Sequence, residues 1–104
     1  MIINSTQASF SDDVVKSDIS IIDFWAPWCG PCKVIAPILE SFDENSTDDI
    51  NIIKVNVDEH PELAGTYNIR NIPTLLFVRN GEILSQHVGT LSEADLTQKV
   101  NNLK

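Results

Sequence analysis

The sequence predicts an α/β fold in which helices cover both faces of a mixed β-sheet. Two strongly apolar runs flank a segment with helical spacing, which is the pattern of a β-α-β unit. Further along, two strand-like runs meet at Asn80-Gly81, a dipeptide favoured in two-residue hairpin turns. The last segment has an amphipathic helical pattern. The chain of 104 residues contains no linker-like stretch, so we expect one domain over residues 1–104.

The first half of the chain contains the predicted β-α-β unit. A short strand in residues 1–4 and a helix near residues 9–16 are expected to precede it. Residues 19–26, ISIIDFWA, are almost continuously apolar, which is typical of a strand buried on both faces. Residues 33–42 carry apolar side chains at helical spacing, and residues 50–58, INIIKVNVD, are strand-like again.

The second half begins with a short helix predicted in residues 60–68, HPELAGTYN, and continues into the hairpin. In the final helix Ser92 stands three residues before Asp95, an arrangement that resembles a capping box. The apolar residues of this helix fall on one face: Leu96, Val100 and Leu103. Together these elements predict a five-stranded mixed sheet flanked by about four helices.

The composition argues against direct contacts with nucleic acids or membranes. Fifteen acidic and seven basic residues give a net charge of −8, whereas nucleic-acid binding depends on basic patches. No run approaches the roughly 18 apolar residues that span a bilayer, and the N-terminus lacks a secretory signal. We therefore expect a cytoplasmic protein, although a processed organelle protein would look the same. The acidic residues 40–49 are interpreted as a solvated helix end and loop, with a partner-selection surface as the alternative.

The stretch FWAPWCGPCK, residues 24–33, contains both cysteines and both tryptophans of the chain. A C-x-x-C pair where a strand feeds into a helix indicates a dithiol redox site. Cys29 is expected at the helix N-terminus, where unpaired N–H groups and the helix dipole lower the pKa of a thiol. We expect Cys32, one turn further on, to be more buried and within reach of the Cys29 sulfur. Pro31 suits the first helical turn because its missing N–H costs nothing there.

A metal site and a bound nucleotide cofactor are both disfavoured. A zinc site needs about four ligands, whereas the chain has two cysteines, and His60 and His87 belong to different predicted elements. No G-x-G-x-x-G or phosphate-binding loop is present, so the chain is not expected to bind a nicotinamide cofactor itself. The predicted working group is therefore the cysteine pair, with no metal and no bound cofactor.

The segments DFWAPWCGPCK, KVNVD, IPTLLFVRNGE and VG occur in this order over nearly the whole chain, and together they closely resemble the thioredoxin family. The resemblance implies a thioredoxin fold, with three α/β/α layers and a central mixed five-stranded sheet. It also implies a protein-disulfide reductase and electron carrier, with Cys29 as nucleophile and Cys32 as resolving thiol. Gly30 and Pro31 are the dipeptide of the reducing members, whereas oxidants and isomerases typically carry other pairs there, so a reductant is favoured.

Two charged residues interrupt apolar strands. Asp23 lies between apolar neighbours in the first long strand, where burial should raise its pKa. The resemblance implies that Asp23 transfers a proton for Cys32, with an edge-facing structural carboxylate as the alternative. Lys54 similarly breaks an apolar strand, and the resemblance places it near Asp23, where its charge would modulate the Asp23 pKa. A solvent-facing lysine is the competing interpretation.

The resemblance also implies a docking surface for client proteins. Ile72 and Pro73 are expected to form a cis peptide bond beside the cysteines, where the Ile72 backbone can pair with a client segment as an added strand. Trp28 is expected to supply an apolar contact, and Val88 and Gly89 a place where a partner backbone approaches closely. A trans proline at a strand start and an ordinary loop glycine are the alternatives.

The partners implied by the resemblance are oxidised protein disulfides and thioredoxin reductase, which recharges the protein and involves NADPH only indirectly. Family-typical clients are ribonucleotide reductase, peroxiredoxins and methionine sulfoxide reductase, and a monomer is expected. Pro27, Asn68 and Asn71 depart from common family residues and flank the docking surface, so they affect partner preference and leave the mechanism alone. A scaffold domain with idle thiols is the rival function, and a dedicated oxidase or isomerase is a third.

Overall fold

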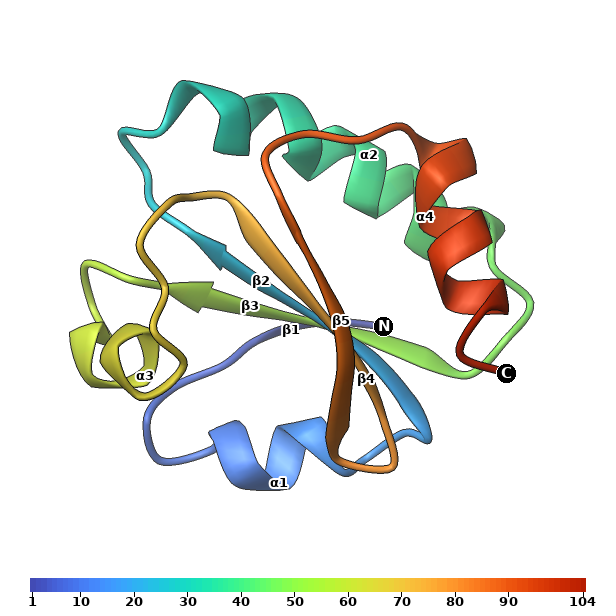
Figure 1. The fold of residues 1–104 in the computed structure, drawn as a ribbon, viewed down its shortest axis with the longest axis horizontal. Coiled ribbons are helices and arrows are strands. Elements are labelled where there is room, and N and C mark those ends of the chain that lie inside the picture. Colours follow the sequence, from blue (N-terminus) through green and yellow to red (C-terminus); the bar gives the residue numbers. More distant parts are fainter.

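The computed structural model describes all 104 residues and contains five strands and four helices (Figure 1). In chain order these are β1 (Ile2–Asn4), α1 (Phe10–Val14), β2 (Ile19–Trp25), α2 (Gly30–Asn45), β3 (Ile50–Asn56), α3 (Pro61–Thr66), β4 (Thr74–Arg79), β5 (Glu82–Val88) and α4 (Glu93–Asn101). Every predicted element is present, and α2 is longer at both ends than its apolar spacing indicated. None of the helices is long and apolar enough to cross a bilayer.

The strands form one mixed sheet in the order β1-β3-β2-β4-β5. Strand β3 pairs in parallel with β1 and β2, as the predicted β-α-β unit requires, and β4 pairs antiparallel with β2 and β5. Asp23 on β2 stands opposite Lys54 on β3 in this register. The predicted fold class is therefore confirmed, and the central strand β2 leads directly toward the N-terminus of α2.

The core consists of two apolar layers, one on each face of the sheet. Helices α2 and α4 cover one face, and α1 and α3 cover the other (Figure 1). Because side chains alternate along a strand, Ile21 belongs to the layer under α2 and α4, and Ile22 to the layer under α1 and α3. Asp23 comes next in this alternation, so its carboxylate faces the side covered by the helix that begins at the cysteines.

Local sequence signals determine the β4–β5 turn and the start of α4. Asn80 and Gly81 have φ values of 51° and 79°, the left-handed conformation that a two-residue hairpin turn of this kind requires. The Asp95 N–H donates to the Ser92 hydroxyl, and the Ser92 N–H donates to the Asp95 carboxylate. The predicted hairpin turn and capping box are both confirmed, since each depends only on residues a few positions apart.

Strand β5 is an edge of the sheet, and most of its side chains are exposed. Its pairing with β4 contains a β-bulge, because Phe77 pairs with Ser85 whereas the next residue, Val78, pairs with Ile83. Leu84 is the extra residue and has no partner on β4. The regular ladder of this edge is therefore interrupted near its middle.

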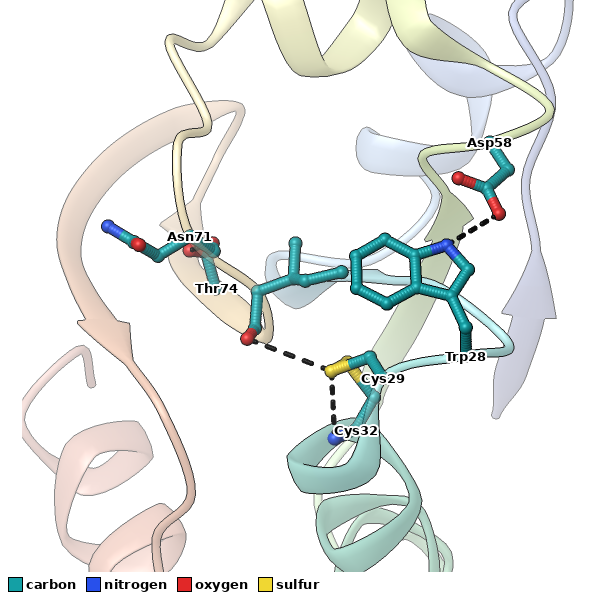
Figure 2. The surroundings of a disulfide bond; sticks show 7 residues. Trp28, Cys29, Cys32, Asp58, Asn71 and Thr74 are labelled. Carbon is teal, nitrogen blue, oxygen red and sulfur yellow. Dashed lines mark hydrogen bonds between the residues drawn. A yellow bond between two sulfur atoms is a disulfide. The ribbon is translucent and has the colours of Figure 1, made fainter.

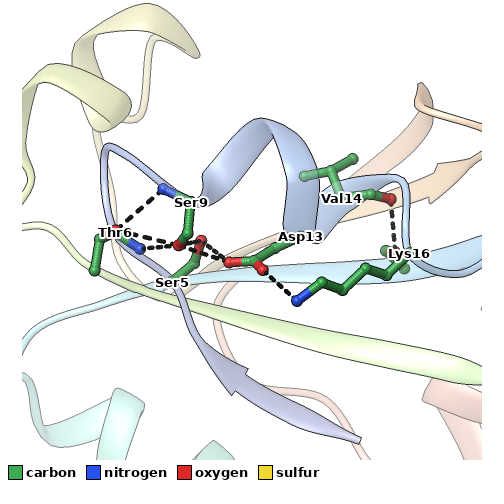
Figure 3. Close-up of polar contacts among 7 residues, drawn as sticks. Ser5, Thr6, Ser9, Asp13, Val14 and Lys16 are labelled. Atoms are coloured by element: carbon green, nitrogen blue, oxygen red, sulfur yellow. Dashed lines mark hydrogen bonds and ion pairs between the residues drawn. The ribbon is translucent and has the colours of Figure 1, made fainter.

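A polar network joins the end of β1 to α1 (Figure 3). The buried carboxylate of Asp13 accepts hydrogen bonds from the Ser5 and Ser9 hydroxyls, each with an oxygen–oxygen distance of 2.8 Å. The Lys16 ammonium lies 3.1 Å from the other carboxylate oxygen. Burial acts to raise the pKa of Asp13, but the hydrogen bonds from the two serines and the Lys16 charge outweigh it and hold the pKa below its ordinary value.

Candidate active site

The two cysteines lie at the N-terminus of α2 and are joined by a disulfide bond (Figure 2). Cys29 is the N-cap residue, and the Cys32 N–H donates a hydrogen bond to its sulfur, with a nitrogen–sulfur distance of 3.2 Å. Pro31 occupies the first turn, as predicted. When the disulfide is reduced, the same N–H group and the positive end of the helix dipole favour a thiolate at Cys29.

Both cysteine side chains are buried, and to the same extent. Each residue is only 4% exposed, so the expectation that Cys32 is the more buried of the pair is wrong. The cause is the packing of Trp25, Val57 and Ile72 against the pair, which covers the N-cap position as well as the first turn of α2. The two sulfurs differ instead in their polar contacts, because only the Cys29 sulfur accepts an N–H of the helix.

The loop before β4 brings the Ile72 carbonyl to the disulfide. The Ile72–Pro73 peptide bond is cis, as predicted, and the Ile72 oxygen lies 3.7 Å from the Cys29 sulfur. A disulfide sulfur carries no proton, so this is a packing contact in the oxidised protein and a weak hydrogen bond once Cys29 is a thiol. The Gly89 N–H donates a hydrogen bond to the Pro73 carbonyl, with a nitrogen–oxygen distance of 2.9 Å. This hydrogen bond fixes the end of β5 against the same loop.

Asp23 is a buried carboxylate without its full set of hydrogen bonds. It is 1% exposed, and its Oδ1 atom has no hydrogen-bond partner. Burial raises the pKa of Asp23 to about 6, against a smaller opposing effect of the Lys54 charge. The predicted burial and raised pKa are confirmed, and the edge-facing alternative is excluded because β2 is a central strand. Such a group can exchange a proton near neutral pH.

Lys54 is half-buried beside Asp23 rather than fully solvent-facing. Its ammonium lies over the Trp25 ring, 5.0 Å from the ring centroid, and forms no ion pair with Asp23. Lys54 therefore acts on the Asp23 pKa through space. Together with Cys32 it lines a cleft of about 160 Å³ between the sheet and α2.

Trp28 is 69% exposed. Its indole N–H donates a hydrogen bond to the Asp58 carboxylate (Figure 2), with a nitrogen–oxygen distance of 2.9 Å. Asp58 was not among the predicted site residues, because a partner 30 positions away leaves no signal in the local sequence. Trp28 also lines a groove of about 230 Å³ that runs toward α3. Its apolar lining consists of Trp28, Val57, Pro61, Ala64, Ile69 and Ile72, with one further residue, Arg70.

Val88 and Gly89 lie at the end of β5, next to the loop before β4. Val88 pairs with Thr74 and is exposed, and Gly89 has a φ of 93°, a conformation that L side chains rarely adopt. Asn68, one of the departures from the family pattern, has a φ of 54°. Asparagine tolerates this left-handed conformation better than most residues, so Asn68 replaces a small residue here at little cost to the backbone.

No group of three or more His, Cys, Asp or Glu side chains lies close enough together to hold a metal ion. His60 is the N-cap residue of α3 and His87 lies on β5, so the two histidines belong to separate elements. The site thus brings together a disulfide-bonded cysteine pair, a carboxyl group with a raised pKa and an apolar groove beside the exposed Trp28.

Comparison with known proteins gives one consistent family. The sequence model of the Thioredoxin family matches residues 1–102. The thioredoxin of Bacillus subtilis is 44% identical over 100 residues, which cover 96% of this chain and 95% of the relative. The thioredoxin of Haemophilus influenzae is 41% identical over 101 residues, covering 96% and 94%. The structure of a mutant thioredoxin from Halobacterium salinarum superposes with a TM-score of 0.87 at 31% identity, covering 99% of this chain and 88% of the other.

Proposed function

The chain belongs to the thioredoxin family, and from this premise we propose that Cys29 is its attacking thiol and Cys32 its resolving thiol. It is a thiol-disulfide oxidoreductase that reduces protein disulfides with the Cys29–Cys32 pair and without a bound cofactor. The observation that supports the assignment of roles is the asymmetry of the α2 N-terminus. Only the Cys29 sulfur accepts a helix N–H, so negative charge is favoured on that sulfur.

The reaction proceeds through a mixed disulfide. The Cys29 thiolate attacks one sulfur of the client disulfide; a Cys29–client bond forms, the client S–S bond breaks, and the second client sulfur leaves as a thiolate that takes up a proton. Cys32 then loses its proton and attacks the Cys29 sulfur. The Cys29–Cys32 disulfide forms, the mixed disulfide breaks, and the first client sulfur leaves and is protonated. Two electrons and two protons thereby pass to the client.

We propose Asp23 as the group that accepts the Cys32 proton. Its carboxylate faces the side of the sheet that α2 covers, and a pKa of about 6 leaves it ionised yet basic enough to take up a proton near neutral pH. Lys54 modulates the transfer because its charge favours the carboxylate form. Gly30 and Pro31, between the cysteines, bias the pair toward reduction of its clients.

Client proteins dock across the loop before β4. An extended client segment pairs with the Ile72 backbone as a short added strand, which brings its disulfide to Cys29. Trp28 and Pro73 supply apolar contact on this surface. Val88 and Gly89, at the end of β5, form its far side.

The partners of the protein are disulfide-bearing proteins and thioredoxin reductase, as in the rest of the family. Within these classes we propose ribonucleotide reductase, peroxiredoxins and methionine sulfoxide reductase as clients, with NADPH entering only through the reductase. The proposal further includes a cytoplasmic location and a monomer that works as one domain.

Reduction of insulin, driven by NADPH and a bacterial thioredoxin reductase, tests the assignment. The wild type should reduce insulin, Cys29→Ser should be inactive, and Cys32→Ser should accumulate a covalent complex with the client that dithiothreitol releases. Full activity of Cys29→Ser would sink the proposed mechanism. Failure of Cys32→Ser to trap a client would remove its resolving role, and an inactive wild type would favour the rival scaffold function.

A further inference from the structure

Most basic side chains of this acidic chain have a partner within the chain. Five of its seven basic residues form an ion pair, a cation–π contact or a hydrogen bond: Lys16, Lys54, Arg79, Lys99 and Lys104. The other two, Lys33 and Arg70, have side chains that make none of these contacts. Lys33 follows Cys32 in α2, and Arg70 stands two residues before Ile72. Both uncommitted cations of a protein with a net charge of −8 therefore flank the disulfide.

Arg70 lines a second cleft, of about 160 Å³, on the β5 side of the docking surface. Three amide side chains, those of Asn68, Asn71 and Gln86, share the lining with it, and none of the three forms a hydrogen bond within the chain. Figure 2 shows the Asn71 side chain pointing away from the disulfide and from Trp28. No acidic residue lines this cleft, so its hydrogen-bond donors and its single charge are free to receive a ligand.

The backbone around the amide-lined cleft is held in place by hydrogen bonds that do not use the side chains of Arg70 or of the three amide residues. The Thr74 hydroxyl donates a hydrogen bond to the backbone carbonyl of Asn71, with an oxygen–oxygen distance of 2.5 Å. Thr74 on β4 also pairs with Val88 on the neighbouring strand β5. The Gly89–Pro73 backbone hydrogen bond closes the same corner. The cleft is thus preformed beside the Ile72 backbone.

Arg70 and its neighbour Ile69 line two clefts of different character. One is the apolar groove of Trp28, and the other is the amide-lined cleft. A client segment that crosses the Ile72 backbone in extended form advances about 3.3 Å per residue, so residues within a few positions of its cysteine reach both clefts. The two clefts therefore offer separate places for an apolar and a polar client side chain.

We propose that the amide-lined cleft binds a carboxylate side chain of the client protein, held by the Arg70 guanidinium and the neighbouring amide N–H groups. Guanidinium pairs with carboxylate through charge-assisted, often bidentate hydrogen bonds, and amide groups add further donors. The inference rests on the proposed function, because the client disulfide must be docked at Cys29. The favoured substrate class is then proteins with Asp or Glu within a few residues of the attacked cysteine.

Matched disulfide peptides test this inference. Each pair differs by one Glu or Gln, and the position of this residue is moved stepwise along the segment around the attacked cysteine. The protein is reduced with dithiothreitol and desalted, and its second-order rate with each peptide is measured at low salt. At one or more positions the wild type should react about threefold to fivefold faster with the Glu peptide, the range expected of a solvent-accessible ion pair. The preference should shrink at high salt.

Variants identify the side chain that causes the preference for Glu. Each variant is compared by the ratio of its rates with the Glu and Gln peptides, because a change in cysteine reactivity alters both rates equally and leaves the ratio unchanged. Arg70→Gln should bring the ratio to about one, and Arg70→Glu should invert it. Lys33→Gln, which removes the same charge on the other side of the cysteines, should keep the wild-type ratio. Asn71→Ala combined with Gln86→Ala should lower it.

Equal rates for the Glu and Gln peptides at every position would overturn the inference while leaving the proposed function intact, because both peptides are then reduced. A preference that survives in Arg70→Gln would overturn it as well. If the wild type reduces neither peptide, the proposed function fails, and the inference that rests on it fails too.

Discussion

Asp13 and Asp23 are both buried in this small protein, at 3% and 1% exposure, yet their pKa values shift in opposite directions. Asp13, in the corner between β1 and α1, accepts hydrogen bonds from two serines and faces an ammonium group (Figure 3). Asp23, on the central strand, has an oxygen with no hydrogen-bond partner, and Lys54 on the neighbouring strand makes no ion pair with it. The two regions therefore differ in the supply of donors and also in depth, because Asp13 lies in a corner near the surface, whereas Asp23 lies on the central strand, where burial outweighs the opposing charge of Lys54.

This contrast separates an acid that stabilises the fold from the acid that we propose for proton transfer. A carboxylate that is fully supplied with donors stays ionised and stabilises the fold. One that lacks donors destabilises the fold when ionised, and its raised pKa lets it take up a proton nearer to the pH range where thiols exchange. In this chain the carboxylate that lacks hydrogen-bond donors is that of Asp23, which lies on the side of the sheet that faces α2 and its cysteines.

The largest expected effect follows from Asp23→Asn, which removes the charge and keeps the shape. The folded pKa of Asp23, about 6, lies above its ordinary value of 3.8, so folding favours the protonated form. Its stabilising contribution is complete below about pH 3.8 and is lost as pH rises through about 6, a difference of roughly 3 kcal/mol. Urea unfolding of the oxidised protein at about pH 8 should show the variant more stable by up to this amount, with the gain disappearing near pH 3.5.

The same variant should reduce insulin more slowly and with a shifted pH profile, because Cys32 then lacks the proton acceptor that we propose for it. Unchanged stability at alkaline pH would contradict the buried, under-supplied carboxylate. An unchanged pH profile of insulin reduction would remove Asp23 from the chemistry.

Asp13→Asn should have the opposite sign and a somewhat smaller size. The substitution weakens two charge-assisted hydrogen bonds and removes the ion pair with Lys16, so we expect a loss of about 2 kcal/mol in the free energy of unfolding near pH 7. Because the folded pKa of Asp13 is lowered, its stabilisation is present above about pH 3.8 and is lost as pH falls through the lowered value. Thermal or urea unfolding measures the loss.

The control for this variant is Asp12→Asn, an exposed neighbour on α1 that makes no hydrogen bond through its side chain. It should leave stability nearly unchanged, and neither α1 variant should alter insulin reduction. Equal effects of the two substitutions would show that the polar network around Asp13 does not stabilise the fold.

The smallest effect is expected from Lys54→Met, which keeps an apolar chain over Trp25 and removes the charge that opposes burial. The pKa of Asp23 should then rise further, by less than about one pH unit, since burial is the larger cause of its shift. A carboxyl carbon NMR titration of Asp23 in the oxidised protein measures the change. Lys99→Met, which removes a similar ammonium over Phe77, serves as the matched control, and equal titrations in the two variants would contradict the role of Lys54.

Only one of the two buried aspartates could be predicted from the sequence. Asp23 interrupts a long apolar run, so a buried charge is apparent from the pattern itself. Asp13 lies in a short polar segment in which it looks like any surface acid. Its partners Ser5 and Ser9 surround it only when the end of β1 and helix α1 pack together, and no spacing rule describes that arrangement.

The candidate site shows the same division. The cysteine pair and its Gly30-Pro31 turn are predictable because their chemistry is contained in four consecutive residues, at a boundary where a strand feeds a helix. The Trp28–Asp58 hydrogen bond and the contact of Ile72 with Cys29 join segments 30 and 43 positions apart. The equal burial of the two cysteines depends on the same distant segments, so it cannot be predicted from the local sequence at the helix N-terminus.

The bulge at Leu84 has a consequence for how copies of the protein meet one another. A straight sheet edge with exposed Ile83 and Leu84 side chains presents evenly spaced backbone donors and acceptors, onto which a strand of a second copy can add. The unpaired residue breaks that even spacing and bends the edge. It thereby works against the addition of a strand from a second copy to this uncovered edge.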